Sequence, residues 1–414
     1  MKKSVNDVML FIGAATLLVI TNFAYFYLFN VGLGNVDIDR PVNYSYYLTV
    51  FILTWGIFFA VIALQRKGTY KMSWFVPICY VALCSYAACR TTFMTTWDTR
   101  ITAYIYSAFS TFHLPLSSIA CMIAFEWIFA RDNQVKFTKR MDYLILLLCL
   151  FGAYMITKQM LFERSGEDYN LSNNIYFLIP LIVYWTTKRQ AWGLIVSVLS
   201  LLLFSVMSLK RGSVVVSGCI IATLMWNYKI RSFILAKVVL VIAALGVGIK
   251  ITQYIESVYF HGQLSERFET IWEGSGRRDQ YAWVIQSIDK FSPGELLVGR
   301  GGNSSVDSYG FFIHNDWLRL MFEYGIVGVV LYSCIAIFFI YKIFELRRAK
   351  SPYISAYSGL FVFFFVYSLY GAVVWVYILN VLPVMGCIMG MEKRRLLAIR
   401  AMYKYPNSNT QLTK

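Results

Sequence analysis

About twelve apolar runs follow one another along the chain, and they constrain its fold more than any motif does. They lie at roughly 8–29, 46–64, 75–89, 104–129, 143–156, 175–185, 192–207, 213–226, 233–249, 324–341, 353–370 and 373–390, the sixth being the shortest. About 20 apolar residues in a helix cross a hydrocarbon core of about 30 Å. Lipid offers no partner to backbone N–H and C=O groups, so each run is expected to be helical. The sequence therefore predicts an all-α, polytopic membrane protein.

Composition agrees with this class. Hydrophobic residues make up 58% of the chain and charged residues only 14%, whereas soluble domains carry about a quarter charged residues. The first 23 residues resemble a signal peptide with a basic start, but Asp7 interrupts the pattern and no small-residue cleavage site follows. We interpret this segment as an uncleaved first span.

The positions of Lys and Arg indicate the orientation. If the N-terminus is cytoplasmic, the inner segments hold 24 of the 38 basic residues and 6 of the 22 acidic ones. Basic loops mark the cytoplasmic side, so both termini are predicted to be cytoplasmic. The net charge of +16 is then a sign of topology, and no basic groove with interspersed aromatic residues indicates nucleic acid as a partner.

One long polar segment interrupts the apolar pattern. We divide the chain into spans one to nine at 1–249, a large outer loop at 250–323, spans ten to twelve at 324–391 and a basic cytoplasmic tail at 392–414. Long loops of this kind are usually functional. None of the eight cysteines falls in the loop, which excludes a disulfide framework or a thiolate metal site there.

Two helices are predicted in the loop. Ser275 can cap a helix from about Arg277 to Lys290, with Tyr281, Ile285 and Ile288 on one face, and Pro293 should stop it. A second helix should begin near Asn315 and continue into the tenth span. His314 would then precede a helix N-terminus, where the dipole disfavours a positive charge and keeps the imidazole neutral.

Four residues are the candidates for chemistry: Arg211, Arg277, Arg278 and His314. Arginine keeps its proton and offers a planar fork to phosphate oxygens, so arginines at a membrane face suit a lipid diphosphate. A span-end arginine that reaches the interface is the alternative for Arg211, and a solvated face is the alternative for Arg278. His113 within a span is expected to be structural, and His261 to be solvated.

Together these features resemble the O-antigen polymerase and O-antigen ligase superfamily. The resemblance rests on an arginine turn opening a span at Arg211, on GSGR around Arg277, on HN at His314, and on Glu323, Gly325 and Gly328 where the loop re-enters the membrane. It covers roughly Met207 to Tyr332 by motif. For the two glycines we expect close helix packing, and for Glu323 a charge near the membrane boundary.

The resemblance implies a glycosyltransferase that acts on undecaprenyl-diphosphate-linked oligosaccharide at the periplasmic face of the bacterial inner membrane. The positions that match the family are Arg211, Arg277 and His314, and these would be catalytic. Arg211 and Arg277 would hold the diphosphate, and we add the neighbouring Arg278 as a further candidate for diphosphate binding. Neither a cofactor nor a metal is needed for this chemistry. The implied partners are the lipid-linked glycan, membrane lipids and a chain-length regulator. Between the two activities we favour polymerase over ligase.

Two other classes remain open. A flippase for lipid-linked oligosaccharides would also have about twelve spans, but it should show related halves and a site near mid-membrane. A metal-dependent glycosyltransferase that uses polyprenyl-phosphate sugars could bind its metal at Asp37 and Asp39 in the first outer loop.

Overall fold

The computed structural model describes residues 2–32, 44–66, 73–94, 101–131, 135–162, 174–188, 191–208, 211–227, 277–302, 304–310, 313–371, 373 and 377–404. Helices make up 91% of these residues, and no strand occurs among them. The prediction of an all-α fold is confirmed.

The helices before the polar loop are α1 (Lys2–Gly32), α2 (Tyr44–Arg66), α3 (Phe75–Met94), α4 (Ile101–Arg131), α5 (Lys136–Phe162), α6 (Asn174–Tyr184), the 3₁₀ helix η1 (Trp185–Thr187), α7 (Ala191–Met207) and α8 (Arg211–Asn227). The later ones are α11 (Arg277–Ile288), α12 (Pro293–Val298), α13 (Ser304–Tyr309), α14 (Asp316–Arg348), α15 (Ile354–Ser368) and α16 (Ile378–Lys404).

Eleven of the twelve predicted runs coincide with a helix, and the ninth, at 233–249, lies outside the described residues. Within the described part of the chain, five helices are long and apolar enough to cross a membrane, and they lie in α1, α2, α4, α5 and α14. Five shorter apolar helices lie in α3, α6 with η1, α7, α8 and α15. The chain therefore has the helices of a membrane protein, while the count of twelve spans stays a prediction.

Helix α4 lies at the centre of the bundle, packed against α16 and against α1, α2 and α3. Every residue from 117 to 130 is buried. Two glycines four residues apart bring α16 close to it: a Cβ at Gly386 would lie 2.3 Å from the Met122 carbonyl oxygen, and one at Gly390 would lie 2.7 Å from Phe129 Cβ. Small residues at this spacing let two helix backbones approach within a membrane.

A pair of buried amides joins three helices. Asn22 Nδ2 of α1 donates to Asn380 Oδ1 of α16 at 3.0 Å, and Asn380 Nδ2 donates to Asn22 Oδ1 at 2.8 Å and to the Phe177 carbonyl of α6 at 3.0 Å. Because these amides satisfy each other away from water, the contact specifies how the three helices meet.

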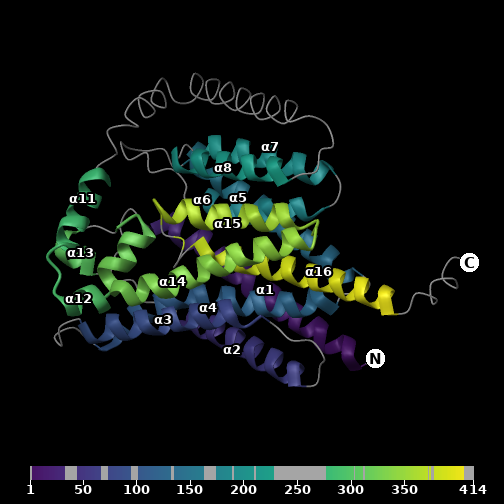
Figure 1. Cartoon of the computed structure of the whole chain (residues 1–414), viewed down its shortest axis with the longest axis horizontal. Coiled ribbons are helices and arrows are strands. Elements are labelled where there is room, and N and C mark those ends of the chain that lie inside the picture. The colour runs from purple at the N-terminus through teal and green to yellow at the C-terminus, as the bar shows by residue number, and fades with distance from the viewer. Residues whose placement is uncertain are drawn as a thin grey trace, which may run out of the picture.

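Figure 1 shows that the two ends of the bundle differ. Helix α1 begins and α16 ends at one end, and α11, α12 and α13 gather at the other. Near the end of α4 the buried Glu126 pairs with Lys393, and near the start of α5 the partly buried Asp142 pairs with Lys188. Helices α11, α12 and α13 therefore lie at the end of the bundle opposite the start of α1 and the end of α16.

Candidate functional site

Helix α11 begins at Arg277 and ends at Ile288, close to the predicted limits. Its buried side differs from the predicted face, because Val284 is fully buried whereas Ile285 is 50% exposed. Val284 packs with Ile313 and with Phe322 of α14, and Trp283 and Ile288 surround this small core. The position of this helix was predicted from its end signals and its polar face. The face that packs against α14 could not be deduced from the sequence of α11 alone. Ser275, its predicted cap, lies outside the described residues.

The turn after α15 receives two side chains from the polar segment. Asn315 Nδ2 donates to the Leu369 carbonyl at 2.7 Å, and Arg277 Nη1 donates to the Tyr370 carbonyl at 3.2 Å. The last carbonyls of a helix have no intrahelical partner and carry a partial negative charge. The Asn315 amide supplies a hydrogen-bond donor, and the Arg277 guanidinium supplies a donor and a positive charge. The Arg277 contact therefore holds α11 against the end of α15.

The same turn contacts the start of α8. Tyr370 Oη donates to the Gly212 carbonyl at 2.6 Å. Arg211 precedes Gly212 and is the first residue of α8; its side chain is not among the described ones. Ser208 and Ser213, on either side of the turn between α7 and α8, have their hydroxyls 2.8 Å apart and buried. The start of α8, where Arg211 lies, is thus held by Ser213 inside the bundle and contacted by Tyr370 at Gly212.

His314 lies immediately before α14, as predicted, and its side chain is exposed. Asn315 is the N-cap, and its side chain accepts from the Leu318 backbone N–H at 3.0 Å. The His314 carbonyl accepts from Tyr281 Oη at 2.8 Å. Burial raises the pKa of the Tyr281 phenol, although the Arg277 charge opposes this, so the phenol keeps the proton it donates. Arg277 and Tyr281, one helical turn apart, both bind backbone carbonyls near the site.

The chain segments of three predicted residues therefore meet around the turn at Leu369, Tyr370 and Gly371. Arg277 contacts the turn directly, Arg211 is one residue from a contact with it, and His314 is followed by Asn315, which contacts it. Arg278, the fourth candidate, is exposed on α11. The sequence separations are large, so this convergence is a property of the fold.

The ring of Tyr370 in the turn belongs to a cluster of four tyrosine rings. Tyr176 of α6 stacks on Tyr367 of α15 with ring centroids 3.9 Å apart, and Tyr377 and Tyr370 contact Tyr367 edge-on at 5.1 and 5.2 Å. Tyr176, Tyr367 and Tyr377 are buried. Such aromatic contacts contribute about 0.5–1.5 kcal/mol each beyond burial, and they give the turn a rigid base.

A second contact region holds α12 against α14. Gly299, at the end of α12, and Gly325, inside α14, have φ angles of +72° and +63°. A Cβ at Gly325 would lie 2.5 Å from the Leu297 carbonyl oxygen, so the glycine is required by a kink and by a close backbone approach. Backbone N–H groups of Arg300 and Gly301 then donate to carbonyls of α14, at 3.0 and 2.8 Å.

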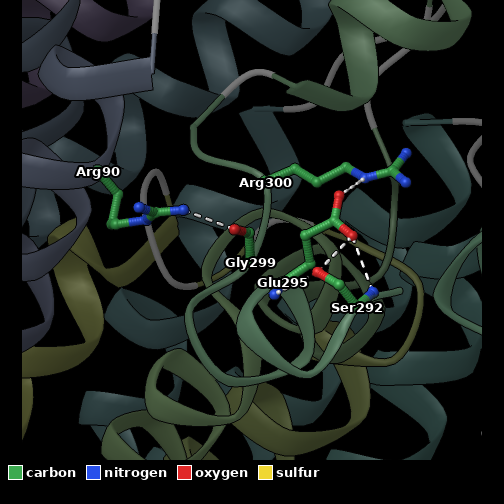
Figure 2. Close-up of polar contacts among 5 residues, drawn as sticks. All are labelled: Arg90, Ser292, Glu295, Gly299 and Arg300. Atoms are coloured by element: carbon green, nitrogen blue, oxygen red, sulfur yellow. Dashed lines mark hydrogen bonds and ion pairs between the residues drawn. The ribbon is translucent and has the colours of Figure 1, made fainter.

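Helix α3 secures the same region. Tyr86 Oη donates to the Val298 and Tyr324 carbonyls, each at 3.1 Å. Figure 2 shows Arg90 reaching from α3 to the Gly299 carbonyl, to which its Nη2 donates at 2.6 Å. The carbonyls at the end of α12 and at the α14 kink are thus satisfied from the membrane bundle.

Helix α12 begins in a capping box, which Figure 2 also shows. Ser292 Oγ accepts from the Glu295 backbone N–H, and the Ser292 N–H donates to the Glu295 carboxylate at 2.9 Å. Hydrogen bonds from Ser292, and secondarily from Arg300, hold the pKa of Glu295 below its usual value. Pro293, predicted only to stop α11, also starts α12. The S-x-x-E pattern was the available signal for this helix.

Glu323 was expected to be a charge near the membrane boundary, and the structure shows the partners of this charge inside the protein. Glu323 is fully buried, its carboxylate accepts from Ser305 Oγ of α13 at 2.8 Å and it pairs with Arg319 at 2.9 Å. Removing a buried carboxylate from water is costly unless it is paired and hydrogen-bonded. Glu323 therefore joins α13 to α14.

The other candidates fall elsewhere. His113 is half-buried in α4 and meets the edges of the Tyr46 and Tyr47 rings at 5.9 and 5.3 Å. His261, Asp37 and Asp39 lie outside the described residues. Within the described ranges, no group of three or more His, Cys, Asp or Glu side chains is arranged to hold a metal ion.

The sequence placed Tyr281 on a helix face, but neither Tyr281 nor Tyr370 was identified as a site residue. Tyr281 lies four residues after Arg277 and so shares its helix face, which was an available signal. For Tyr370, the sequence shows only a Tyr-Gly break between two apolar runs, which predicts a turn but not the segments that contact it. Compared with protein-family models and with curated proteins, the sequence gives no match.

Proposed function

We propose that this protein is a membrane glycosyltransferase that joins undecaprenyl-diphosphate-linked repeat units into a surface polysaccharide. In this proposal it acts as a polymerase of the O-antigen type at the periplasmic face of the bacterial inner membrane. The observation that carries the proposal is the convergence of the Arg211, Arg277 and His314 segments at the turn after α15. These segments carry the motifs by which the chain resembles the superfamily.

The arginines would bind the diphosphate. Among the described residues Arg277 makes one hydrogen bond, to Tyr370, and a guanidinium has five N–H donors. It is half-buried at the end of the bundle, where other donors can meet phosphate oxygens. Arg211 and Arg278 would add charge from α8 and from the next position of α11. Fixed cations of this kind stabilise a departing diphosphate as its negative charge grows.

His314 would act as the general base. Its ring is exposed, so an acceptor sugar can reach it. The imidazole takes the proton from the acceptor hydroxyl as that oxygen bonds to the anomeric carbon of the donor glycan. The bond from this carbon to the diphosphate oxygen breaks, and the undecaprenyl diphosphate leaves with the electron pair. A positioned base of this type contributes about 10²- to 10⁴-fold in rate.

Reconstitution tests the proposal directly. Purified protein in lipid nanodiscs, supplied with undecaprenyl-diphosphate-linked repeat units, should form polymer that gel electrophoresis resolves. Arg277→Ala should reduce the rate by at least about 10²-fold, and Arg277→Lys nearly as far, because lysine keeps the charge but lacks the fork. Lys290→Ala, an exposed change just beyond α11, is the matched control and should behave as wild type. Normal rates for both Arg277 variants would contradict the proposal.

Ligase is the second candidate, because the same diphosphate and base chemistry serves it with lipid A-core as the acceptor. The glycolipids of a deletion strain separate the two activities. Loss of a polymerase leaves core capped by a single repeat, whereas loss of a ligase leaves bare core and accumulated lipid-linked polymer. We expect the single-repeat pattern.

A further inference from the structure

Tyr370 contacts both arginine-bearing segments, and it does so with two different groups. Its backbone carbonyl accepts from Arg277 Nη1 at 3.2 Å, and its phenol donates to the Gly212 carbonyl at 2.6 Å. Gly212 is bonded directly to Arg211 at the start of α8. Tyr370 therefore connects Arg277 to the start of α8.

Tyr370 is itself held firmly. Its backbone N–H donates to the Tyr367 carbonyl at 3.2 Å, and its ring meets the Tyr367 ring edge-on. The neighbouring Leu369 carbonyl is bound by Asn315. A Cβ on Gly212 would lie 2.6 Å from Tyr370 Cε2 and 2.8 Å from Tyr176 Oη, so the ring packs directly on the α8 backbone. The Tyr370 side chain thus fixes the distance between the turn after α15 and the start of α8.

We infer that Tyr370 is a positioning residue that sets the start of α8, and with it Arg211, relative to Arg277, so that one diphosphate meets both arginines. This inference rests on the proposed function. A diphosphate is short, and two guanidinium groups can share it only at a limited separation. In catalysis, displacement of a positioning group by about 1 Å can cost about 10²-fold in rate. Tyr370→Phe removes only the hydroxyl and leaves the carbonyl that holds Arg277.

The test measures binding of geranylgeranyl diphosphate, and of the monophosphate for comparison, by isothermal titration calorimetry in nanodiscs. Tyr370→Phe should raise the Kd for the diphosphate about ten-fold and leave the Kd for the monophosphate nearly unchanged. In an Arg211→Ala background the same change should add less than about two-fold, because the guanidinium that Tyr370 would position is then absent. Gly212→Ala, which displaces the Tyr370 ring, should reproduce the effect of Tyr370→Phe.

Tyr367→Phe is the matched control, since it removes a hydroxyl from the neighbouring buried ring, and it should bind both ligands as wild type does. Wild-type diphosphate affinity in Tyr370→Phe would overturn the inference. An equal loss of affinity in the presence and absence of Arg211 would also overturn it, because a general packing defect does not depend on Arg211. If wild-type protein does not prefer the diphosphate and Arg277→Ala changes nothing, the proposed function itself is wrong. If Arg277→Ala abolishes the preference while Tyr370→Phe is silent, only the role of Tyr370 is wrong.

Discussion

At the scale of single residues, the site depends on side chains that bind backbone. Tyr281 binds the His314 carbonyl, and Asn315 both caps α14 and binds Leu369. These bonds fix the chain on either side of His314 while its ring stays exposed. A base held in this way can stay close to an acceptor hydroxyl without being buried, which suits an acceptor as large as a glycan.

His314→Ala and His314→Gln are both expected to lower polymer formation by about 10²- to 10⁴-fold, as loss of a general base does. Circular dichroism and yield should stay normal, because the described backbone contacts of His314 do not need its ring. Wild-type turnover should decrease as the pH falls through the range in which a histidine takes up a proton, about pH 6.5 for an unperturbed side chain, since only neutral imidazole accepts a proton. The measurement is initial rate against pH in nanodiscs. Near-normal product from His314→Ala would remove the base from the mechanism.

At the scale of elements, the polar segment is joined to the bundle through a kinked helix. Helix α14 continues from the end of the bundle where α11, α12 and α13 lie into a predicted span, and the kink at Gly325 lets the end of α12 approach its backbone closely. Tyr86 and Arg90 of α3 complete the contact. Because His314 and Asn315 directly precede α14, a shift of the helix at the kink should also displace these two residues.

Gly325→Ala is expected to destabilise this junction. The φ of +63° with ψ of −163° is a conformation that costs a non-glycine residue about 1–3 kcal/mol, and the added Cβ would clash with the α12 backbone. Amide hydrogen exchange in α12 and at the α14 start should speed up, and polymer formation should fall. Gly294→Ala is the control, because nothing lies within 4 Å of its added Cβ and exchange should stay as in wild type. Equal exchange in the two variants would argue against a structural need for the kink.

The polar segment also shows where sequence reasoning ended. Caps and polarity were enough to place α11 and the start of α14. The burial of Glu323 was not predicted, because burial of a carboxylate depends on partners, here Ser305 and Arg319, that only the folded chain brings together. Tyr370 was missed for a similar reason: its carbonyl and hydroxyl bind residues 93 and 158 positions away.

At the scale of the whole molecule, hydropathy predicted the helices correctly, because a chain in lipid must satisfy its backbone hydrogen bonds internally. The apolar runs outside 233–249 all correspond to helices. Their order in the bundle was not predictable, because it depends on close contacts such as Gly386 on Met122 and Asn22 with Asn380. These contacts bring α4, α16, α1 and α6 together, and the packing of α15 on α8 places the turn at Tyr370 beside Gly212.

The orientation of the bundle is the last prediction. Basic residues mark the cytoplasmic side, and in Figure 1 the end of α16 lies opposite α13. Single cysteines at Ser308 and Ala401, both exposed, should therefore differ in their reactivity with a reagent added from outside. The native cysteines are removed first, because Cys89 is exposed and would react as well. Ser305 is unsuitable because it is buried against Glu323. In intact spheroplasts, a membrane-impermeant maleimide should label Ser308→Cys and spare Ala401→Cys, and detergent should make both reactive. If only Ala401→Cys were labelled before detergent is added, the topology would be the opposite of the predicted one. The arginines and His314 would then lie on the cytoplasmic side, where a periplasmic polymerase could not use them.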